Sequence, residues 1–127
     1  MIAVDTSALM AIVLDEAKAQ ACAATLVAEQ EIKISAATLA ECLIVAQRQK
    51  RREEMRELIE GLGMDPIAVT AASARRVGDA YQKWGKGIHP AGLNFGDCFA
   101  YVLAQEYACG LLYVGNDFSK TDVRSVI

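Results

Sequence analysis

The first nine residues read Met1-Ile2-Ala3-Val4-Asp5-Thr6-Ser7-Ala8-Leu9. The apolar run Ile2 to Val4 predicts a short strand buried on both faces, because a half-exposed strand would alternate polar and apolar residues. Asp5 ends this strand, and the mainly apolar stretch from Thr6 to Leu14 predicts a helix directly after it. A buried strand followed at once by a helix is typical of α/β proteins with a parallel sheet.

The same alternation of short apolar strands and longer helical segments continues along the chain. Further strands are expected at 32–34, 66–69 and 111–114, with a possible fifth at 123–127, and helices at 17–30, 37–50, 51–62, 71–84 and 94–108. This order predicts an α/β fold with a parallel sheet covered by helices on both faces. In such sheets, ligands bind beyond the carboxyl ends of the strands.

The composition bounds the class of protein. A chain of 127 residues is expected to form one domain, residues 1–127, and a hydrophobic content of 54% excludes a disordered chain. No uncharged stretch approaches the roughly 20 residues of a membrane span, so we expect no membrane partner. The net charge of −3 argues against binding nucleic acid by bulk charge alone, but it does not exclude a contact through local basic patches.

The N-terminus and the cysteines indicate a compartment. No basic segment precedes the first apolar run, and Asp5 interrupts that run, so we expect no signal peptide. Cys22, Cys42, Cys98 and Cys109 contain no CxxC pair and lie among apolar neighbours, which favours buried free thiols over a zinc site or disulfides. Both observations predict a cytoplasmic protein.

Four acids lie in unusual surroundings. Asp5 and Asp117 each follow a predicted parallel strand, while Glu41 and Asp97 are the only acids of long apolar stretches. A buried carboxylate is costly unless it is paired, hydrogen-bonded or bound to a metal. These four residues are therefore the candidate site.

Each acid also has a purely structural interpretation. Asp5 could cap the helix that follows it, and Asp117 could be a turn residue. Thr38-Leu39-Ala40-Glu41 matches a capping box, and Asp97 stands three residues after a good cap, Asn94. These interpretations leave unexplained why acids recur at the same end of the predicted sheet.

A cluster of carboxylates would either raise one of their pKa values or bind a cation. With oxygen ligands and no cluster of His or Cys, the cation would be Mg²⁺ or Mn²⁺. Such ions lower the pKa of a bound water and stabilise the charge of a phosphodiester under attack.

Four segments of the chain resemble the motifs of PIN-domain proteins, and most closely those of VapC-type toxins of bacterial toxin–antitoxin pairs. They occur in family-like order and spacing and together extend over essentially the whole chain: Met1 to Leu9, Ser35 to Glu41, Leu93 to Tyr101 and Leu112 to Phe118. The resemblance implies a Rossmann-like three-layer α/β/α sandwich with a central parallel sheet. It also implies a ribonuclease that depends on Mg²⁺ or Mn²⁺.

The resemblance also implies roles for individual residues. Asp5 and Asp97 match the direct metal ligands, and Glu41 matches a group that binds metal or orients water. Asp117 would complete a second metal position or act through water. These four acids would be the catalytic set.

Three polar residues match supporting positions of the family. Thr6 or Ser7 matches a hydroxyl that supports the first acid, and Asn116 matches a polar position beside the last one. Many relatives carry Thr or Ser directly after the fourth strand, whereas this chain has Tyr113-Val114-Gly115 before Asn116. Whether one or two metals bind therefore stays open, and Asp122 offers a further carboxylate in the same part of the chain.

The implied partners are RNA as substrate, a cognate antitoxin and a second copy of the chain in a homodimer. The apolar helices predicted at 6–14 and 17–30 are candidates for the antitoxin groove. The basic cluster Arg48 to Arg56 is either a solvated set of ion pairs or an RNA contact. His89, the only histidine, has no required role in the family's mechanism.

The sequence also bears on two other functions. A non-catalytic PIN-like module that binds RNA or protein is the main alternative, motivated by the altered segment before Asn116. A phosphatase with an Asp nucleophile is disfavoured, because Asp5-Thr6-Ser7 lacks a second Asp two residues after the first.

Overall fold

The computed structural model describes all 127 residues and contains four strands and six helices. None of the helices is long and apolar enough to cross a membrane. In chain order the elements are β1 (Ile2–Val4), α1 (Thr6–Val13), α2 (Ala19–Ala28), β2 (Ile32–Ser35), α3 (Ala36–Arg48), α4 (Arg52–Leu62), β3 (Asp65–Ile67), α5 (Ala71–Trp84), α6 (Phe95–Glu106) and β4 (Gly110–Leu112).

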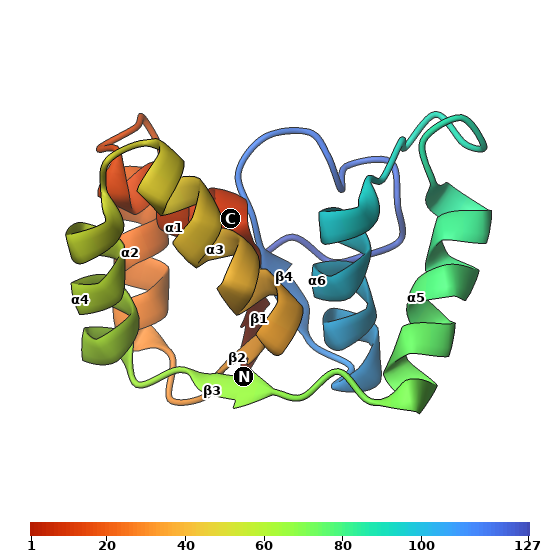
Figure 1. Ribbon diagram of the computed structural model, residues 1–127, viewed down its shortest axis with the longest axis horizontal. Coiled ribbons are helices and arrows are strands. Elements are labelled where there is room, and N and C mark those ends of the chain that lie inside the picture. The colour runs from red at the N-terminus through yellow and green to blue at the C-terminus, as the bar shows by residue number, and fades with distance from the viewer.

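The four strands form one parallel sheet in the order β3-β2-β1-β4. Helices α1 to α4 lie on one side of this sheet, and α5 and α6 lie on the other (Figure 1). The strands have the short apolar sequences expected when both faces of a sheet are covered. The three-layer α/β/α architecture predicted from the sequence is therefore confirmed.

The hydrophobic core is divided between the two faces of the sheet. On β1, Ile2 and Val4 pack with α1 to α4, whereas Ala3 between them packs with α6, as the alternation of side chains along a strand requires. The largest buried side chains of the second core include Tyr101 and Phe118. Because Phe118 lies beyond β4, the C-terminal segment is anchored in this core.

One predicted element is missing from the structure, and the strands predicted at 66–69 and 111–114 are present with shifted bounds, as β3 and β4. The expected fifth strand at 123–127 is absent, and only an isolated bridge joins Leu111 to Ser125. Leu111 supplies both backbone hydrogen bonds of this contact, donating to Arg124 and accepting from Val126. The segment between β4 and this bridge makes turns instead of extending the pairing.

The cysteines are unpaired. Cys22, Cys42 and Cys98 are buried, as expected, whereas Cys109 is half-buried. Burial raises the pKa of Cys42 to about 12 and that of Cys98 to about 11, so both thiols are protonated at neutral pH.

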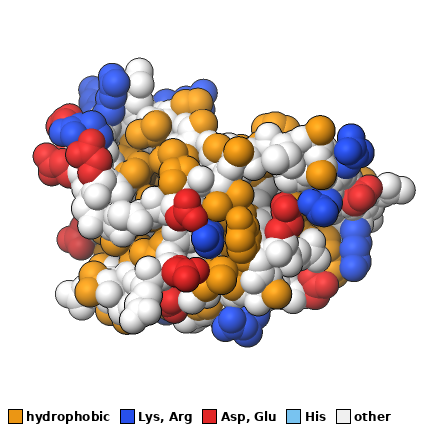
Figure 2. Space-filling view, turned by 90° about the horizontal axis from the view of Figure 1, so that it is seen from below, with side chains coloured by type: hydrophobic (Ala, Val, Ile, Leu, Met, Phe, Trp, Pro, Cys, Tyr) orange, Lys and Arg blue, Asp and Glu red, His pale blue; other side chains and the backbone are white.

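Ion pairs gather away from the carboxyl ends of β1 and β4. The lower edge of Figure 1, where β3 and the N-terminus lie, is shown face-on in Figure 2, with charged side chains of both signs beside hydrophobic ones. Two of the pairs given by the structure join Lys33 to Asp65 and the N-terminal amine to Glu29. None of the six ion pairs of the molecule involves the four candidate acids.

Candidate active site

The four candidate acids come from four separate parts of the fold. Asp5 follows β1, Glu41 lies on α3, Asp97 lies in the first turn of α6, and Asp117 lies in the segment after β4. Asp5, Glu41 and Asp117 each raise the pKa of Asp97 through charge repulsion, which places all four in one electrostatic neighbourhood. The expectation that they lie close together is met.

Asp5 is buried at the start of α1, with 4% of its surface exposed. One carboxylate oxygen, Oδ2, accepts hydrogen bonds from the backbone N–H of Ser7 at 3.0 Å and from its hydroxyl at 2.7 Å. Burial raises the pKa of Asp5, while the bonds from Ser7 oppose that rise. The other oxygen, Oδ1, takes part in neither of these two bonds.

Two hydroxyls beside Asp5 connect it to the rest of the site. The Ser7 hydroxyl also accepts the backbone N–H of Val114 at 3.0 Å, which fastens the end of β4 to the start of α1. The Thr6 hydroxyl donates to Oε1 of Glu41. Thr6 and Ser7 therefore both support the site, each at a different acid.

Glu41 projects from the middle of α3 against the first turn of α6. Its Oε2 lies so close to Gly96 that a Cβ there would overlap the carboxylate. Thr38 lies inside α3, whose cap is Ser35, so the alternative interpretation of Thr38 and Glu41 as a capping box is wrong. The Glu41 carboxylate instead joins α1 to α6.

Asp97 forms a capping box with Asn94. The Asn94 side chain accepts the N–H of Asp97 at 2.8 Å, and Oδ2 of Asp97 accepts the N–H of Asn94 at 3.0 Å. Burial and then repulsion from the other three acids raise the pKa of Asp97 to about 7, against the opposing bond from Asn94. This carboxyl therefore releases its proton at a much higher pH than an ordinary Asp does.

Asp117 is exposed in the segment after β4. The next residue, Phe118, is 1% exposed and packs against Tyr113 with ring centroids 5.0 Å apart, which anchors the segment. Asn116 is exposed, and its carbonyl accepts the hydroxyl and the N–H of Ser119. Asn116 and Asp117 therefore lie on a turn that the packed rings of Tyr113 and Phe118 anchor to the core.

The structural interpretations of Asp5 and Asp97 are also correct, because Asp5 caps α1 and Asp97 completes the capping box of α6. The hydrogen bonds from Ser7 and Asn94 go to Oδ2 of these carboxylates and not to Oδ1. Capping and ligand binding are therefore compatible roles for the same side chain. The caps hold the two carboxylates in place.

The acids are close but do not form a closed cage. No three His, Cys, Asp or Glu side chains meet at one point in a metal-ligand arrangement. The residues nevertheless suit a hard cation by their chemistry, since they offer only oxygen atoms and have no Lys or Arg to neutralise them.

Asp122, considered as a further acid for the site, belongs to another cluster. It accepts a hydrogen bond from the hydroxyl of Tyr101, which in turn accepts from Trp84 at 2.9 Å and from Gln105 at 2.8 Å. Burial raises the pKa of Tyr101 to about 12, so its hydroxyl remains a donor. This network ties the C-terminal segment to α5 and α6.

Replacing Tyr101 with Phe is expected to lower the free energy of unfolding by about 1–3 kcal/mol, because Trp84 and Asp122 both lose their partner. Chemical denaturation measures the change. Tyr107→Phe is the matched control, since the Tyr107 hydroxyl makes no hydrogen bond in the structure. An equal loss in both variants would contradict the role of the network.

The basic cluster Arg48 to Arg56 is only partly neutralised. Arg56 pairs with Glu53 and Glu60, and Arg51 pairs with Glu54. The other cations of the cluster, Arg48, Lys50 and Arg52, have no ion pair. The ion-pair interpretation is thus confirmed for Arg51 and Arg56. An RNA contact by the other cations stays a prediction.

His89 has a structural setting. Its ring packs edge-on against Trp84 with centroids 4.8 Å apart, and its Nδ1 accepts the N–H of Ala91 at 3.0 Å. These contacts stabilise the loop between α5 and α6.

Comparison with known proteins identifies the family of the chain. The family model described as PIN domain matches residues 2–124. The chain is 42% identical to Ribonuclease VapC28 of Mycobacterium tuberculosis over 128 residues, which covers 98% of this chain and 96% of that protein. It is 40% identical to Ribonuclease VapC42 of the same organism, with 95% of each chain covered.

Solved structures share the fold at low sequence identity. VapC20 of Mycobacterium tuberculosis, described as a Sarcin-Ricin loop cleaving toxin, is similar with a TM-score of 0.78 at 15% identity, covering 97% of this chain and 96% of that one. A toxin–antitoxin complex from Klebsiella pneumoniae is similar with a TM-score of 0.74 at 18% identity, covering 100% and 97%. From the family match and the identity to curated relatives, the chain belongs to the PIN-domain family and, within it, to the VapC ribonuclease toxins of toxin–antitoxin systems.

Proposed function

We propose that this VapC ribonuclease hydrolyses RNA phosphodiester bonds with the help of Mg²⁺ or Mn²⁺ held by Asp5 and Asp97. One observation supports the proposal above the others: four acids from separate elements share one site without a cationic side chain to neutralise them. Such a site has an unmet electrostatic demand that a divalent cation satisfies.

Each residue has a distinct part in this proposal. Asp5 and Asp97 present their Oδ1 atoms to the cation while their caps keep Oδ2 in place. Glu41, fixed by Thr6, orients the attacking water or adds an oxygen ligand. Asp117 completes the site from the segment after β4. A bound cation would activate water and stabilise the negative charge that develops on the phosphate.

Partners and location belong to the same proposal. Structures similar in fold include a toxin–antitoxin complex from Klebsiella pneumoniae and VapBC2 from Rickettsia felis, so we propose a cognate antitoxin as partner. We also propose that residues 1–127 form a single PIN domain, that the chain forms a homodimer, and that it acts in the cytoplasm. Non-catalytic binding is less well supported, because the chain carries all four acids of the site.

Incubation of antitoxin-free protein with RNA and Mn²⁺ tests the function. Cleavage is expected with Mn²⁺ and not with excess chelator, and Asp97→Asn is expected to remove it. Cleavage that survives both chelation and substitution would show that the acids are not the site.

The metal-free protein is expected to lose stability as pH rises from about 5 to about 8. The pKa of Asp97 is raised in the folded state to about 7, so the folded chain holds a proton that the unfolded chain has released, and this contribution disappears as pH passes 7. Asp5 acts in the same direction. Thermal unfolding of wild type and Asp97→Asn across this range measures the difference.

The size of this effect is expected to be about 1–3 kcal/mol, because solvent around the partly exposed carboxyl screens the repulsion. Mn²⁺ is expected to restore stability at pH 8 in the wild type, because the ionised carboxylates bind it and the unfolded chain does not. A wild type and an Asp97→Asn variant with parallel pH profiles would contradict the assignment.

A further inference from the structure

The largest pocket of the molecule lies between α5 and α6 and has a volume of about 620 Å³. Asn94 links it directly to the acids, because it lines the pocket and its N–H is bonded to Asp97. The other walls are mainly apolar and include Val77, Tyr81 and Phe95. An occupant of this pocket would thus reach the proposed catalytic site.

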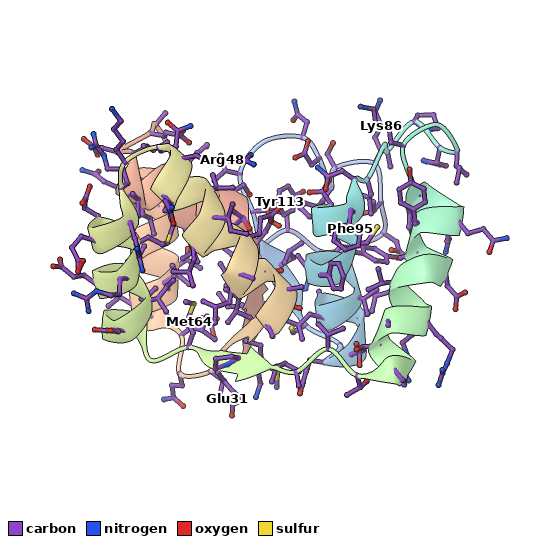
Figure 3. The ribbon with its side chains drawn as sticks, in the orientation of Figure 1. Glu31, Arg48, Met64, Lys86, Phe95 and Tyr113 are labelled. Atoms are coloured by element: carbon purple, nitrogen blue, oxygen red, sulfur yellow. The ribbon has the colours of Figure 1, made fainter.

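Two aromatic side chains, Tyr81 and Phe95, line the pocket. Phe95, labelled in Figure 3, is 75% exposed at the start of α6. Its ring packs edge-on against Phe99, with ring centroids 4.9 Å apart. Tyr81 packs against Gly85, and its hydroxyl donates to the carbonyl of Lys86 at 3.1 Å. Both rings are therefore held in position while part of each faces solvent. This is a suitable setting for stacking a flat ring.

The charge at the pocket favours an anionic occupant. Lys86, which Figure 3 shows on the segment joining α5 to α6, lines the pocket, and its amine has no ion pair. A basic peptide attracted by the four acids would be repelled by Lys86 at the pocket. A nucleotide carries both a flat base and a phosphate, and proteins recognise single-stranded RNA by stacking its bases on aromatic side chains.

We propose that the pocket between α5 and α6 binds a nucleobase of the RNA next to the bond that is cut. Phe95 is its stacking platform, and Lys86 contacts a neighbouring phosphate. The proposal rests on the proposed function. It makes Phe95 a determinant of which nucleotide is accepted beside the cleaved bond.

Phe95→Ala is expected to raise KM for a short single-stranded RNA about tenfold or more and to change kcat less than about threefold, because stacking contributes to binding. Phe95→Trp should restore KM, since it replaces one platform with another. Ile127→Ala, at a 45% exposed apolar residue at the C-terminus, is the matched control and should leave both constants unchanged. Cleavage products sequenced from Phe95→Ala should show a relaxed preference at one flanking nucleotide.

Lys86→Gln gives an independent reading of the phosphate contact. It is expected to weaken RNA binding and to lower the slope of log affinity against log salt by about one. An unchanged KM in Phe95→Ala would overturn the base pocket. The same conclusion would follow if Phe95→Ala weakened only self-association or antitoxin binding and not RNA binding. A slope unchanged by Lys86→Gln would overturn the phosphate contact.

Binding without cleavage separates this proposal from the proposed function. Anisotropy of a labelled RNA is measured with Asp5→Asn, alone and combined with Phe95→Ala. A tenfold weaker affinity in the double variant supports the pocket even if no chain cleaves RNA. Equal affinities overturn the pocket even if the wild type is an active ribonuclease.

Discussion

Asp5→Asn is expected to lower kcat/KM for RNA cleavage in Mn²⁺ by at least about a hundredfold. Substitutions of groups that merely orient metal ligands cost 10–100-fold, so the loss of a direct ligand should cost more. Asn removes the negative charge at Oδ1 and leaves an oxygen that can still accept the hydrogen bonds from Ser7. Rates of cleavage at several Mn²⁺ concentrations measure the effect.

The same variant should fold at least as stably as the wild type when metal is absent. Asn is a good helix cap. It also removes the cost of burying a charged carboxylate, the same cost that raises the pKa of Asp5. A lower activity with an equal or higher melting temperature would identify Asp5 as a functional residue held at a cost to stability. Asp122→Asn, which changes an acid of the Tyr101 network, should keep full activity. Similar losses in both variants would contradict the assignment.

Gly96→Ala is expected to lower kcat/KM about tenfold to a hundredfold with little loss of stability. The added Cβ would overlap Oε2 of Glu41, and this flexible carboxylate can swing away more easily than the backbone of α6 can move. Glu41 would then leave its position beside Thr6 and the other acids. The expected cost matches that of displacing a group that orients a metal site.

Gly61→Ala is the matched control for this substitution. Gly61 lies on α4, and a Cβ there meets nothing within 4 Å. Its replacement should raise the free energy of unfolding by about 0.5–1 kcal/mol and leave cleavage unchanged. Full activity in Gly96→Ala would show that the observed place of Glu41 is not needed for the reaction.

Much of the fold could be predicted because it depends on local pattern. The strand Ile2–Val4 and the helix Ala71–Trp84 have the predicted bounds, and the caps Ser35 and Asn94 are where their residue types suggest. The tail at 123–127 was harder, because an apolar residue that packs into a core and one that pairs in a sheet look alike in a short segment.

The membership of the candidate site could also be predicted, since an acid after a buried strand or inside an apolar helix is conspicuous in the chain. Its geometry could not. The close approach of Glu41 to Gly96 and the bond from Val114 to Ser7 join segments that are far apart in sequence. Such contacts depend on how helices and strand ends pack in space, which periodicity along one segment does not encode.

The chemical properties of individual side chains depend on this packing in space. The sequence alone indicates Asp97 as a candidate site residue and Asn94 as a helix cap. The pKa of about 7 for Asp97 arises from burial and from repulsion by three carboxylates that folding brings near it. Likewise, Phe95 and Tyr81 are ordinary aromatic residues in the chain, and only the packing of α5 beside α6 makes them walls of one pocket. Local preferences act over a few residues, but desolvation and charge repulsion act through space between any groups that the fold makes neighbours.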